Sequence, residues 1–142
     1  MTEKIEISGK CLCGAVTFNA KIAEPHVGAC HCVMCRKWGS GPFMEVDCGT
    51  DVSYEGAENI STFSSSDWAE RGFCAKCGSN LFYRLKESGQ TMMAVGLLDD
   101  DSGLALKGQV FIDEKPPYYN FAEKTENLTG AEVFALFGGD GS

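Results

Sequence analysis

The sequence predicts a mainly β fold made of small antiparallel sheets, on three observations. Short segments alternate apolar and polar residues, turn-forming residues separate them, and two distant cysteine pairs offer ligands for a metal ion. The segments "KIEIS" and "AVTFNA" flank the first cysteine pair. Five more expected strands follow, at residues 42–48, 51–56, 80–85, 91–98 and 109–114. Alternation with a period of two is typical of half-buried strands.

Helical periodicity is confined to the end of the chain, in "TGAEVFALFGG". Thr129 is the expected N-cap, and Glu132 three residues later completes a capping-box pattern. The helix is expected to end at Gly138 and Gly139. One face of this short helix is expected to be buried through Val133, Phe134, Leu136 and Phe137.

Length and charge limit the class of protein. A chain of 142 residues is expected to form a single domain over residues 1–142. Its net charge of −8, with 12 scattered Lys and Arg, argues against nucleic-acid and membrane partners. The charged start "MTEKIEISGK" does not resemble a signal peptide, so a cytoplasmic location is expected. Thiols stay reduced there, and the eight cysteines therefore favour metal binding over disulfides.

Two cysteine pairs are each followed directly by glycine, in "CLCG" and "CAKCG". Such a glycine permits the tight turn in which backbone N–H groups face the sulfurs. Together the pairs predict a closed, structural zinc site, whose ligands are Cys11, Cys13, Cys74 and Cys77. The alternative is two buried or redox-active pairs. A redox CxxC usually opens a helix, whereas the second pair precedes the strand-like "SNLFYRL".

A third group lies in "GACHCVMCRKWG" and predicts a different kind of site. In an extended chain Cys30 and Cys32 share a face and His31 points away from it. A turn through the next two residues then returns Cys35 to the same face. Three thiolates are one ligand short of a closed tetrahedron, so this is expected to be an open zinc site.

The fourth ligand of the open site has two candidates, His26 and Cys48. Cys48 shares a strand face with Met44 and Val46, which favours a buried core cysteine. Zn²⁺ with three thiolates carries a net charge of −1 and ionises water poorly. Arg36 and Lys37 are placed to offset that charge. A soft thiolate substrate suits the open position, which favours thiol chemistry.

These motifs resemble a known family. "GKCLCGAVTF", "CHCVMCRKWGSGPF" and "STFSSSDWAERGFCAKCGSNLFYR" are similar, in order and spacing, to the glutathione-dependent formaldehyde-activating enzymes, whose domain also occurs in centromere protein V. The resemblance covers about residues 5–119 and leaves 120–142 as a C-terminal extension. It implies small β-sheets folded as a "tent" over zinc, with two zinc ions per chain. The structural ion is bound by Cys11, Cys13, Cys74 and Cys77, and the catalytic ion by Cys30, Cys32 and Cys35.

The resemblance also implies a carbon–sulfur lyase activity, in which glutathione or a similar thiol adds to formaldehyde or another small aldehyde, or the reverse. This chain departs from the family pattern near its end. Many members have His where this chain has Gln109, and Trp after the Lys-Pro segment where it has Tyr118 and Tyr119. The expected helix at residues 129–137 is not part of the family pattern either.

Three further features have two interpretations each, and a fourth has one. Arg71 either binds a substrate carboxylate or caps local carbonyls and pairs with a nearby acid. Residues Ser64 to Ser66 form a polar turn, or line the site by analogy with the family. Trp38 shields the metal or belongs to the core. Asp99 to Asp101 are expected to form a solvated turn.

Three functions follow from the sequence. The first is the zinc-dependent thiol–aldehyde enzyme. The second is a zinc-stabilised module that binds a protein partner. The third is a redox sensor in which Cys30, Cys32 and Cys35 exchange between zinc and a disulfide.

Overall fold

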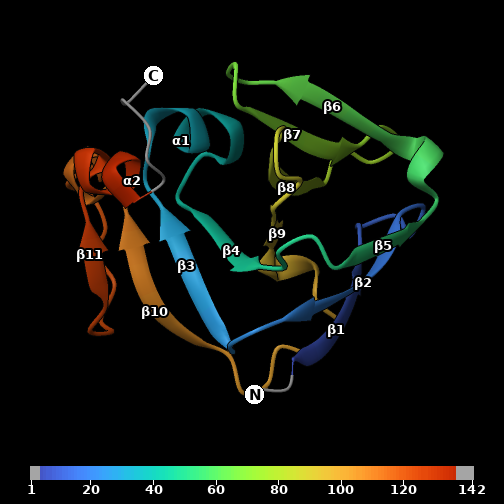
Figure 1. Ribbon diagram of the computed structural model, residues 1–142, viewed down its shortest axis with the longest axis horizontal. Coiled ribbons are helices and arrows are strands. Elements are labelled where there is room, and N and C mark those ends of the chain that lie inside the picture. The colour runs from blue at the N-terminus through green and yellow to red at the C-terminus, as the bar shows by residue number, and fades with distance from the viewer. Residues whose placement is uncertain (1–3, 137–142) are drawn as a thin grey trace. The chain divides into compact units, whose positions relative to one another are not determined.

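A computed structural model describes residues 4–136 of the chain, and strands dominate this range (Figure 1). The mainly β prediction is confirmed. The strands are β1 (Ile5–Lys10), β2 (Thr17–Ile22), β3 (His26–Cys30), β4 (Phe43–Asp47), β5 (Val52–Glu55), β6 (Ile60–Ser64), β7 (Ala69–Cys74), β8 (Asn80–Leu85), β9 (Thr91–Ala94), β10 (Ala105–Val110) and β11 (Glu126–Leu128). The α-helices are α1 (Val33–Gly39) and α2 (Gly130–Leu136), and the 3₁₀ turns are η1 (Ala57–Asn59), η2 (Val95–Leu97) and η3 (Ile112–Glu114).

The chain divides into two compact units. The first comprises Met1–Pro25 and Glu45–Leu104, and the second comprises His26–Met44 and Ala105–Ser142. The two glycine-flanked cysteine pairs belong to the first unit. The third cysteine group belongs to the second unit.

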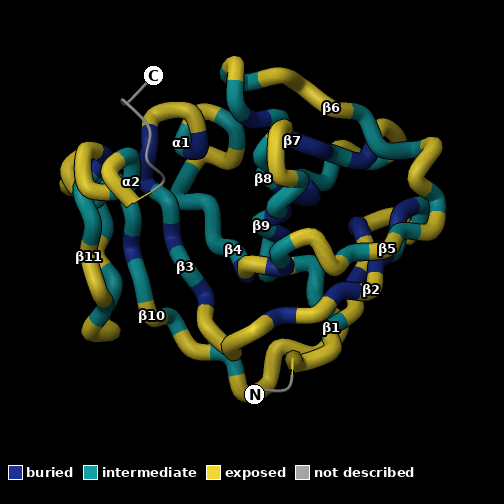
Figure 2. The backbone as a smooth tube through the Cα atoms, viewed as in Figure 1, coloured by how far each residue is buried: buried dark blue, intermediate teal, exposed yellow. Residues whose placement is uncertain are grey.

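The first unit contains two antiparallel arrangements. In one, β2 lies between β1 and β5, and it buries Phe18, Ala20 and Ile22 at every second position. In the other, the strand order is β4-β9-β8-β7-β6. Across this ladder Val46 pairs with Met93, and Met93 pairs with Phe82. All three are fully buried, so they form the core of this unit (Figure 2).

Strand β7 has a sequence, "AERGFC", that carries little strand signal. Its place between β6 and β8 comes from contacts made by distant residues. Gly72 lies opposite Phe82, and a Cβ at position 72 would approach the Phe82 ring to 2.3 Å. The absence of a side chain therefore lets the buried ring pack against the backbone. Arg84 adds a two-pronged ion pair to Glu70, at 3.0 and 2.9 Å.

The second unit is built on parallel pairing, which the alternation pattern did not indicate. Strand β10 pairs in parallel with β3 on one side and with β11 on the other. The expected strand at residues 109–114 ends at Val110, because Phe111 adopts a left-handed conformation with φ of 54° and η3 follows. Helix α1 begins within the cysteine motif itself, directly after β3.

The predicted capping box of the last helix is confirmed. The Thr129 hydroxyl accepts from the N–H of Glu132 at 3.2 Å, and the Glu132 carboxylate accepts from the N–H of Thr129 at 2.9 Å. Phe134 packs edge-on against Phe111 with ring centroids 5.7 Å apart. The expected burial of Leu136 is wrong, because it is 71% exposed. Phe137, Gly138 and Gly139 lie outside the described residues.

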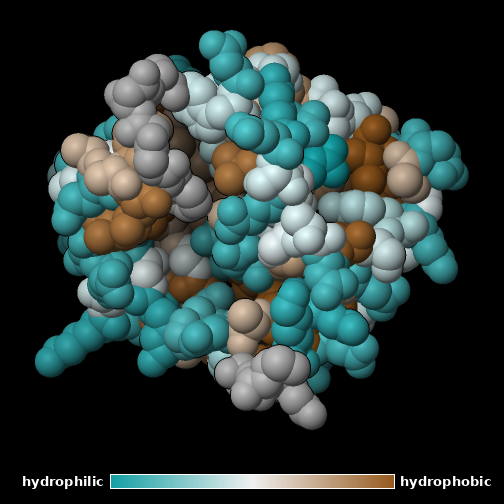
Figure 3. Space-filling model, in the orientation of Figure 1, coloured by the Kyte–Doolittle hydropathy of each residue, from teal (hydrophilic) through white to brown (hydrophobic). Residues whose placement is uncertain are grey.

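The surface in view in Figure 3 is mostly polar. Hydrophilic side chains cover most of the face in view in Figure 3, and apolar residues appear there as separate small patches. Within residues 4–136, neither helix has the length and hydrophobicity needed to span a membrane.

Candidate metal centres

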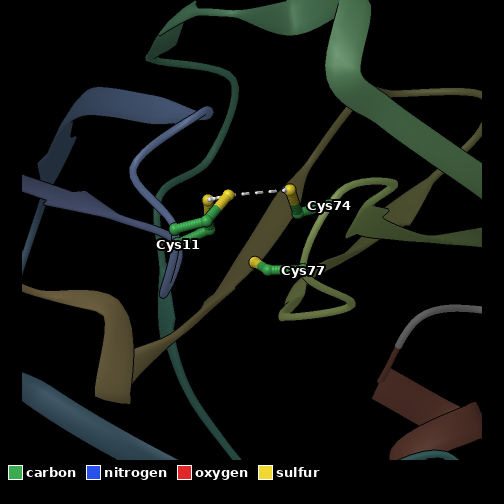
Figure 4. Close-up of side chains that lie close together, drawn as sticks. Cys11, Cys74 and Cys77 are labelled. Atoms are coloured by element: carbon green, nitrogen blue, oxygen red, sulfur yellow. Dashed lines mark hydrogen bonds between the residues drawn. The ribbon is translucent and has the colours of Figure 1, made fainter.

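The two glycine-flanked cysteine pairs converge in the first unit. The sulfurs of Cys11, Cys13, Cys74 and Cys77 all lie within 4.8 Å of one another. Cys13 Sγ is 3.7 Å from Cys11 Sγ and 3.8 Å from Cys74 Sγ. Figure 4 shows the labelled side chains of Cys11, Cys74 and Cys77 gathered around a common centre. Four thiols at this separation match the donor set of a closed zinc site.

Both pairs form the expected tight turns. Gly14 has φ of 81° and donates its N–H to the Cys11 carbonyl at 3.1 Å. Gly78 has φ of 79° and donates to the Cys74 carbonyl at 2.8 Å. Only glycine adopts such angles at little cost, which explains the residue that follows each pair. The N–H of Val16 also donates to Cys11 Sγ at 3.4 Å, as expected around a metal-bound thiolate.

Ser79 joins the two turns of this four-thiol cluster. Its hydroxyl accepts from the N–H of Leu12 at 3.0 Å and lies 3.2 Å from Cys77 Sγ. The Ser79 hydroxyl, followed by the Ser79 N–H and the backbone of Cys13, lowers the pKa of Cys77 to about 5. Cys77 is therefore favoured as a thiolate, the form that binds a metal. Sequence reasoning assigned no role to Ser79, because the signal is a single serine after the second glycine.

The three-thiol cluster lies in the second unit, at the junction of β3 and α1. The sulfurs of Cys30, Cys32 and Cys35 lie within 4.8 Å of one another. Cys32 and Cys35 are buried, and Cys30 is half-buried. Cys32 is the N-cap of α1, and its sulfur accepts from the N–H of Cys35 at 3.3 Å. The expected turn after Cys32 is thus the first turn of a helix.

Crowding makes a second negative charge costly in this cluster. Hydrogen bonding with Cys32 and then Cys35, followed by burial, raises the pKa of Cys30 far above its ordinary value. A divalent cation would offset that repulsion, and three sulfur donors are the choice of a soft or borderline metal such as zinc. The residues present therefore fit a zinc ion bound by three thiolates. Arg36 and Lys37 follow on α1, and their role in offsetting the charge of the cluster stays a prediction.

The two fourth-ligand candidates are not part of this cluster among the described residues. His26 is exposed at the start of β3. Cys48 belongs to the first unit, is 1% exposed, and directs its thiol to the Val46 carbonyl at 3.8 Å. The prediction of a buried core cysteine at position 48 is confirmed. Among the described residues the cluster therefore consists of three thiols, and its open fourth position stays a prediction.

His31 lies between two of the thiols but faces the opposite way, as expected. It is fully buried, with Nε2 2.7 Å from Gln109 Oε1 and Nδ1 2.7 Å from the Tyr119 hydroxyl. Burial lowers the pKa of His31, the bond to Gln109 acts in the opposite sense, and the charges of Lys115 and Arg36 add to the lowering. His31 is therefore a neutral anchor of the cysteine loop.

A second anchor joins η3 to the start of α1. The Glu114 carboxylate accepts from the N–H of Val33 at 2.9 Å, and Arg36 donates to the Glu114 carbonyl at 3.0 Å. Sequence reasoning missed this contact, because the partners are 81 and 78 positions apart. Together with the His31 bonds, it holds the cysteine loop against the segment that follows β10.

The other residues singled out in the sequence, Arg71, Trp38 and the Asp99–Asp101 turn, lie in the following environments. Arg71 lies on β7 in the first unit, is 3% exposed, and places its guanidinium 5.1 Å from the centre of the Tyr83 ring. Its role as a carboxylate-binding residue stays a prediction. Trp38 packs against Phe43 with centroids 5.4 Å apart. The Asp99–Asp101 turn is exposed, and Asp99 accepts from Ser8, so the prediction of a solvated turn is confirmed.

The serine segment after β6 makes local bonds. Ser64 donates to the carbonyl of Ser66 at 3.2 Å, and the Ser66 hydroxyl accepts from the N–H of Ala69 at 3.2 Å. These contacts are those of a polar turn. A role of these serines in lining a site stays a prediction.

Comparison with known proteins agrees with the cysteine geometry. Residues 6–114 match the family model described as glutathione-dependent formaldehyde-activating enzyme. The chain belongs to this family. An uncharacterized lyase of Schizosaccharomyces pombe is 38% identical over 129 residues, which is 90% of this chain and 94% of that protein. A crystal structure of a Rhodobacter sphaeroides protein shares the fold with a TM-score of 0.57 at 23% identity, over 65% of this chain and 87% of that one.

Proposed function

We propose that this protein is a zinc-dependent carbon–sulfur lyase that joins a small thiol to a small aldehyde and catalyses the reverse cleavage. Glutathione and formaldehyde are the proposed pair, on the strength of the family description. The relative in Schizosaccharomyces pombe that carries the name lyase supports the same class of reaction. The observation that carries the proposal is the convergence of three thiols, which could hold a metal ion and, as only three ligands, would leave one position for substrate.

The two clusters are assigned different roles. Cys11, Cys13, Cys74 and Cys77 supply four ligands from turns far apart in the sequence, which suits a structural zinc. The other cluster supplies three ligands from one short stretch, Cys30 to Cys35. It is the proposed catalytic centre, because Cys30 is partly accessible while the other two thiols are enclosed.

The reaction is an addition across a carbonyl group. The thiol loses its S–H proton, a carbon–sulfur bond forms, and the carbonyl oxygen takes up a proton to give a hydroxyl; cleavage reverses each change. Cys30, Cys32 and Cys35 would hold the zinc ion, which would supply a borderline-soft Lewis acid that favours the thiolate form of a substrate thiol. The bonds that anchor the cysteine loop would keep the three sulfurs, and any ion they bind, in a fixed position, so that reactants meeting there would be held close together.

The test is the rate of thiol–aldehyde exchange above the spontaneous rate, measured by exchange NMR with glutathione and formaldehyde. We expect the wild type to accelerate exchange and Cys32→Ser to lose the acceleration while keeping its fold and the structural zinc. Cys48→Ala is the matched control, because it removes a buried cysteine outside both clusters. Full activity in a folded Cys32→Ser protein that holds one zinc would disprove the proposal.

A redox sensor is the second candidate function, on one specific observation. Cys32 and Cys35 form a CxxC pair that opens α1, with a hydrogen bond from the Cys35 N–H to the Cys32 sulfur. This arrangement is typical of reactive cysteine pairs. Reversible zinc release by dilute peroxide, without loss of the fold, would favour the sensor. An inert site that turns over thiol and aldehyde would favour the enzyme.

We also propose a cytoplasmic location, in which the eight cysteines stay reduced and available to metal. The proposed partners are small molecules, since the net charge of −8 opposes nucleic acid and anionic membranes.

A further inference from the structure

The described part of the C-terminal extension lies beside the strand that leads to the anchors of the cysteine loop. Strand β11 pairs in parallel with β10, with Gln109 opposite Asn127 and Val110 opposite Leu128. The Gln109 side chain also donates to Thr125 Oγ1 at 2.9 Å. On its other side β10 pairs with β3, the strand that ends in the three-thiol cluster (Figure 1). All these elements belong to the second unit.

Helix α2 contacts the first residues after β10. Its first residue, Gly130, donates its N–H to Asp113 Oδ1 at 2.9 Å. A Cβ on Gly130 would lie 2.7 Å from the Phe111 ring, so the ring packs directly against the glycine backbone. Phe134, one turn further along α2, meets the same ring edge-on with centroids 5.7 Å apart. The Phe111 ring is therefore held by two residues that share one face of α2.

Phe111 has to be held, because its backbone lies in the left-handed region with φ of 54°. A bulky side chain seldom adopts this conformation, which persists only where the surrounding contacts outweigh its cost. The reversal at Phe111 ends β10 and begins η3, where the Glu114 N–H donates to the Phe111 carbonyl at 2.9 Å. The conformation of Phe111 thus sets the direction in which η3 leaves the sheet.

The residues on the two sides of Phe111 hold the cysteine loop. Before it, the Val110 carbonyl accepts from the N–H of His31 at 3.1 Å. After it, the Glu114 carboxylate accepts from the N–H of Val33 at 2.9 Å. His31 and Val33 directly flank the second of the three cysteines. A change of the backbone at Phe111 would therefore move these two acceptors relative to each other, and the thiols with them.

We propose that the C-terminal extension is a brace for the three-thiol cluster, in which Gly130 and Phe134 of α2 are positioning residues that keep Phe111 left-handed. Metal binding at the cluster and docking of α2 then stabilise each other, because both depend on the same arrangement of the loop. The inference rests on the proposed function for the metal ion and is independent of the thiol and the aldehyde. The family match covers residues 6–114, so both positioning residues lie outside it.

The test is hydrogen exchange of individual amides, measured by NMR in zinc-loaded wild type, Phe134→Ala and Gly130→Ala. We expect both variants to speed hydrogen exchange of the His31 and Val33 amides about tenfold, while amides of β8 and β9 in the first unit keep their rates. Gly130→Ala separates a brace from a helix that acts only through its own stability. Alanine favours the helix more than glycine does, but its Cβ would displace the Phe111 ring.

A second readout is the zinc affinity of the three-thiol cluster, measured by competition with a coloured chelator. The release step of this cluster is the one that Cys32→Ser lacks. We expect Phe134→Ala to weaken zinc binding there about tenfold and to leave the zinc of the four-thiol cluster unchanged. Leu136→Ala is the matched control, because this side chain of the same helix is 71% exposed and should alter neither readout.

Three results would overturn the inference: unchanged hydrogen exchange at the two loop amides in both variants, equal acceleration in both units, or a zinc affinity of the three-thiol cluster that Phe134→Ala leaves unaltered. Selective loosening of the loop and weaker zinc binding, in a protein whose wild type does not accelerate thiol–aldehyde exchange, would support the brace and contradict the proposed reaction. The two failures are therefore distinguishable.

Discussion

Removing one ligand from the four-thiol cluster should destabilise the protein far more than removing one from the three-thiol cluster. Cys13 Sγ and Cys74 Sγ, one from each turn, lie 3.8 Å apart and belong to residues 61 positions apart. If a metal bound by both turns is treated as a cross-link that closes a loop of this length, it stabilises the folded state by about 4 kcal/mol, because it restricts the unfolded chain. The three-thiol cluster spans about five residues, for which the same relation gives about 2 kcal/mol.

The assay is urea unfolding of the wild type, Cys74→Ser and Cys35→Ser, each with zinc and with a chelator. Serine is close to cysteine in size, so the change mainly removes a ligand. We expect Cys74→Ser to lower the free energy of unfolding by about 4 kcal/mol and Cys35→Ser by about 2 kcal/mol or less. With the chelator present, the free energies of unfolding of the wild type and Cys74→Ser should differ only by the cost of burying one hydroxyl.

Two results would refute this reasoning. One is an equal loss of stability in both variants, which would mean that the four-thiol cluster does not close a long loop through metal. The other is a wild type whose unfolding is unchanged by the chelator, which would mean that the cluster holds no stabilising ion.

Three further predictions concern the scaffold. Gly72→Ala should lower the free energy of unfolding by about 1–3 kcal/mol in urea titrations, because the new Cβ would lie 2.3 Å from the buried Phe82 ring; an unchanged midpoint would contradict this packing. Glu45 Oε2 is enclosed without a donor among the described residues, and burial, with a smaller contribution from Asp47, raises its pKa to about 7. The native state then binds more protons than the unfolded state between about pH 4.5 and 7, so the free energy of unfolding of the wild type falls as pH rises through that window. Glu45→Gln lacks this titration, so its free energy of unfolding relative to the wild type should rise by up to about 3 kcal/mol between low pH and pH above 7. A difference between the two proteins that stays constant with pH would contradict this prediction. Thr129→Ala removes the cap of α2 and should speed hydrogen exchange of its amides by roughly fivefold, the effect of about 1 kcal/mol, whereas unaltered exchange would show that packing alone holds the helix.

The cysteine groups were predictable because ligand spacing and the following glycines are local. Gly14 and Gly78 both adopt the left-handed angles that such turns require. The capping box at Thr129 is local too, because it depends only on Thr129 and Glu132. Strands with clear alternation, such as β2 and β8, were also found for this reason.

The rest depends on contacts between distant residues. Strand β7 is formed through Gly72 beneath Phe82 and through the Glu70–Arg84 pair, none of which shows in a window of "AERGFC". Helix α1 has seven residues, too few for a periodic pattern, and its cap is a cysteine sulfur instead of the usual hydroxyl or carboxylate. The partners of His31 lie 78 and 88 positions away, so their convergence required the fold.

The most direct test of the two-centre account is the zinc content per chain, measured by elemental analysis of reduced protein for the wild type, Cys32→Ser and Cys74→Ser. The account predicts about two zinc ions in the wild type, one in folded Cys32→Ser, and loss of the tightly held ion in Cys74→Ser. A wild type with a single zinc ion that Cys32→Ser retains in full would contradict it, because the three-thiol cluster would then hold no metal at which thiol and aldehyde could meet.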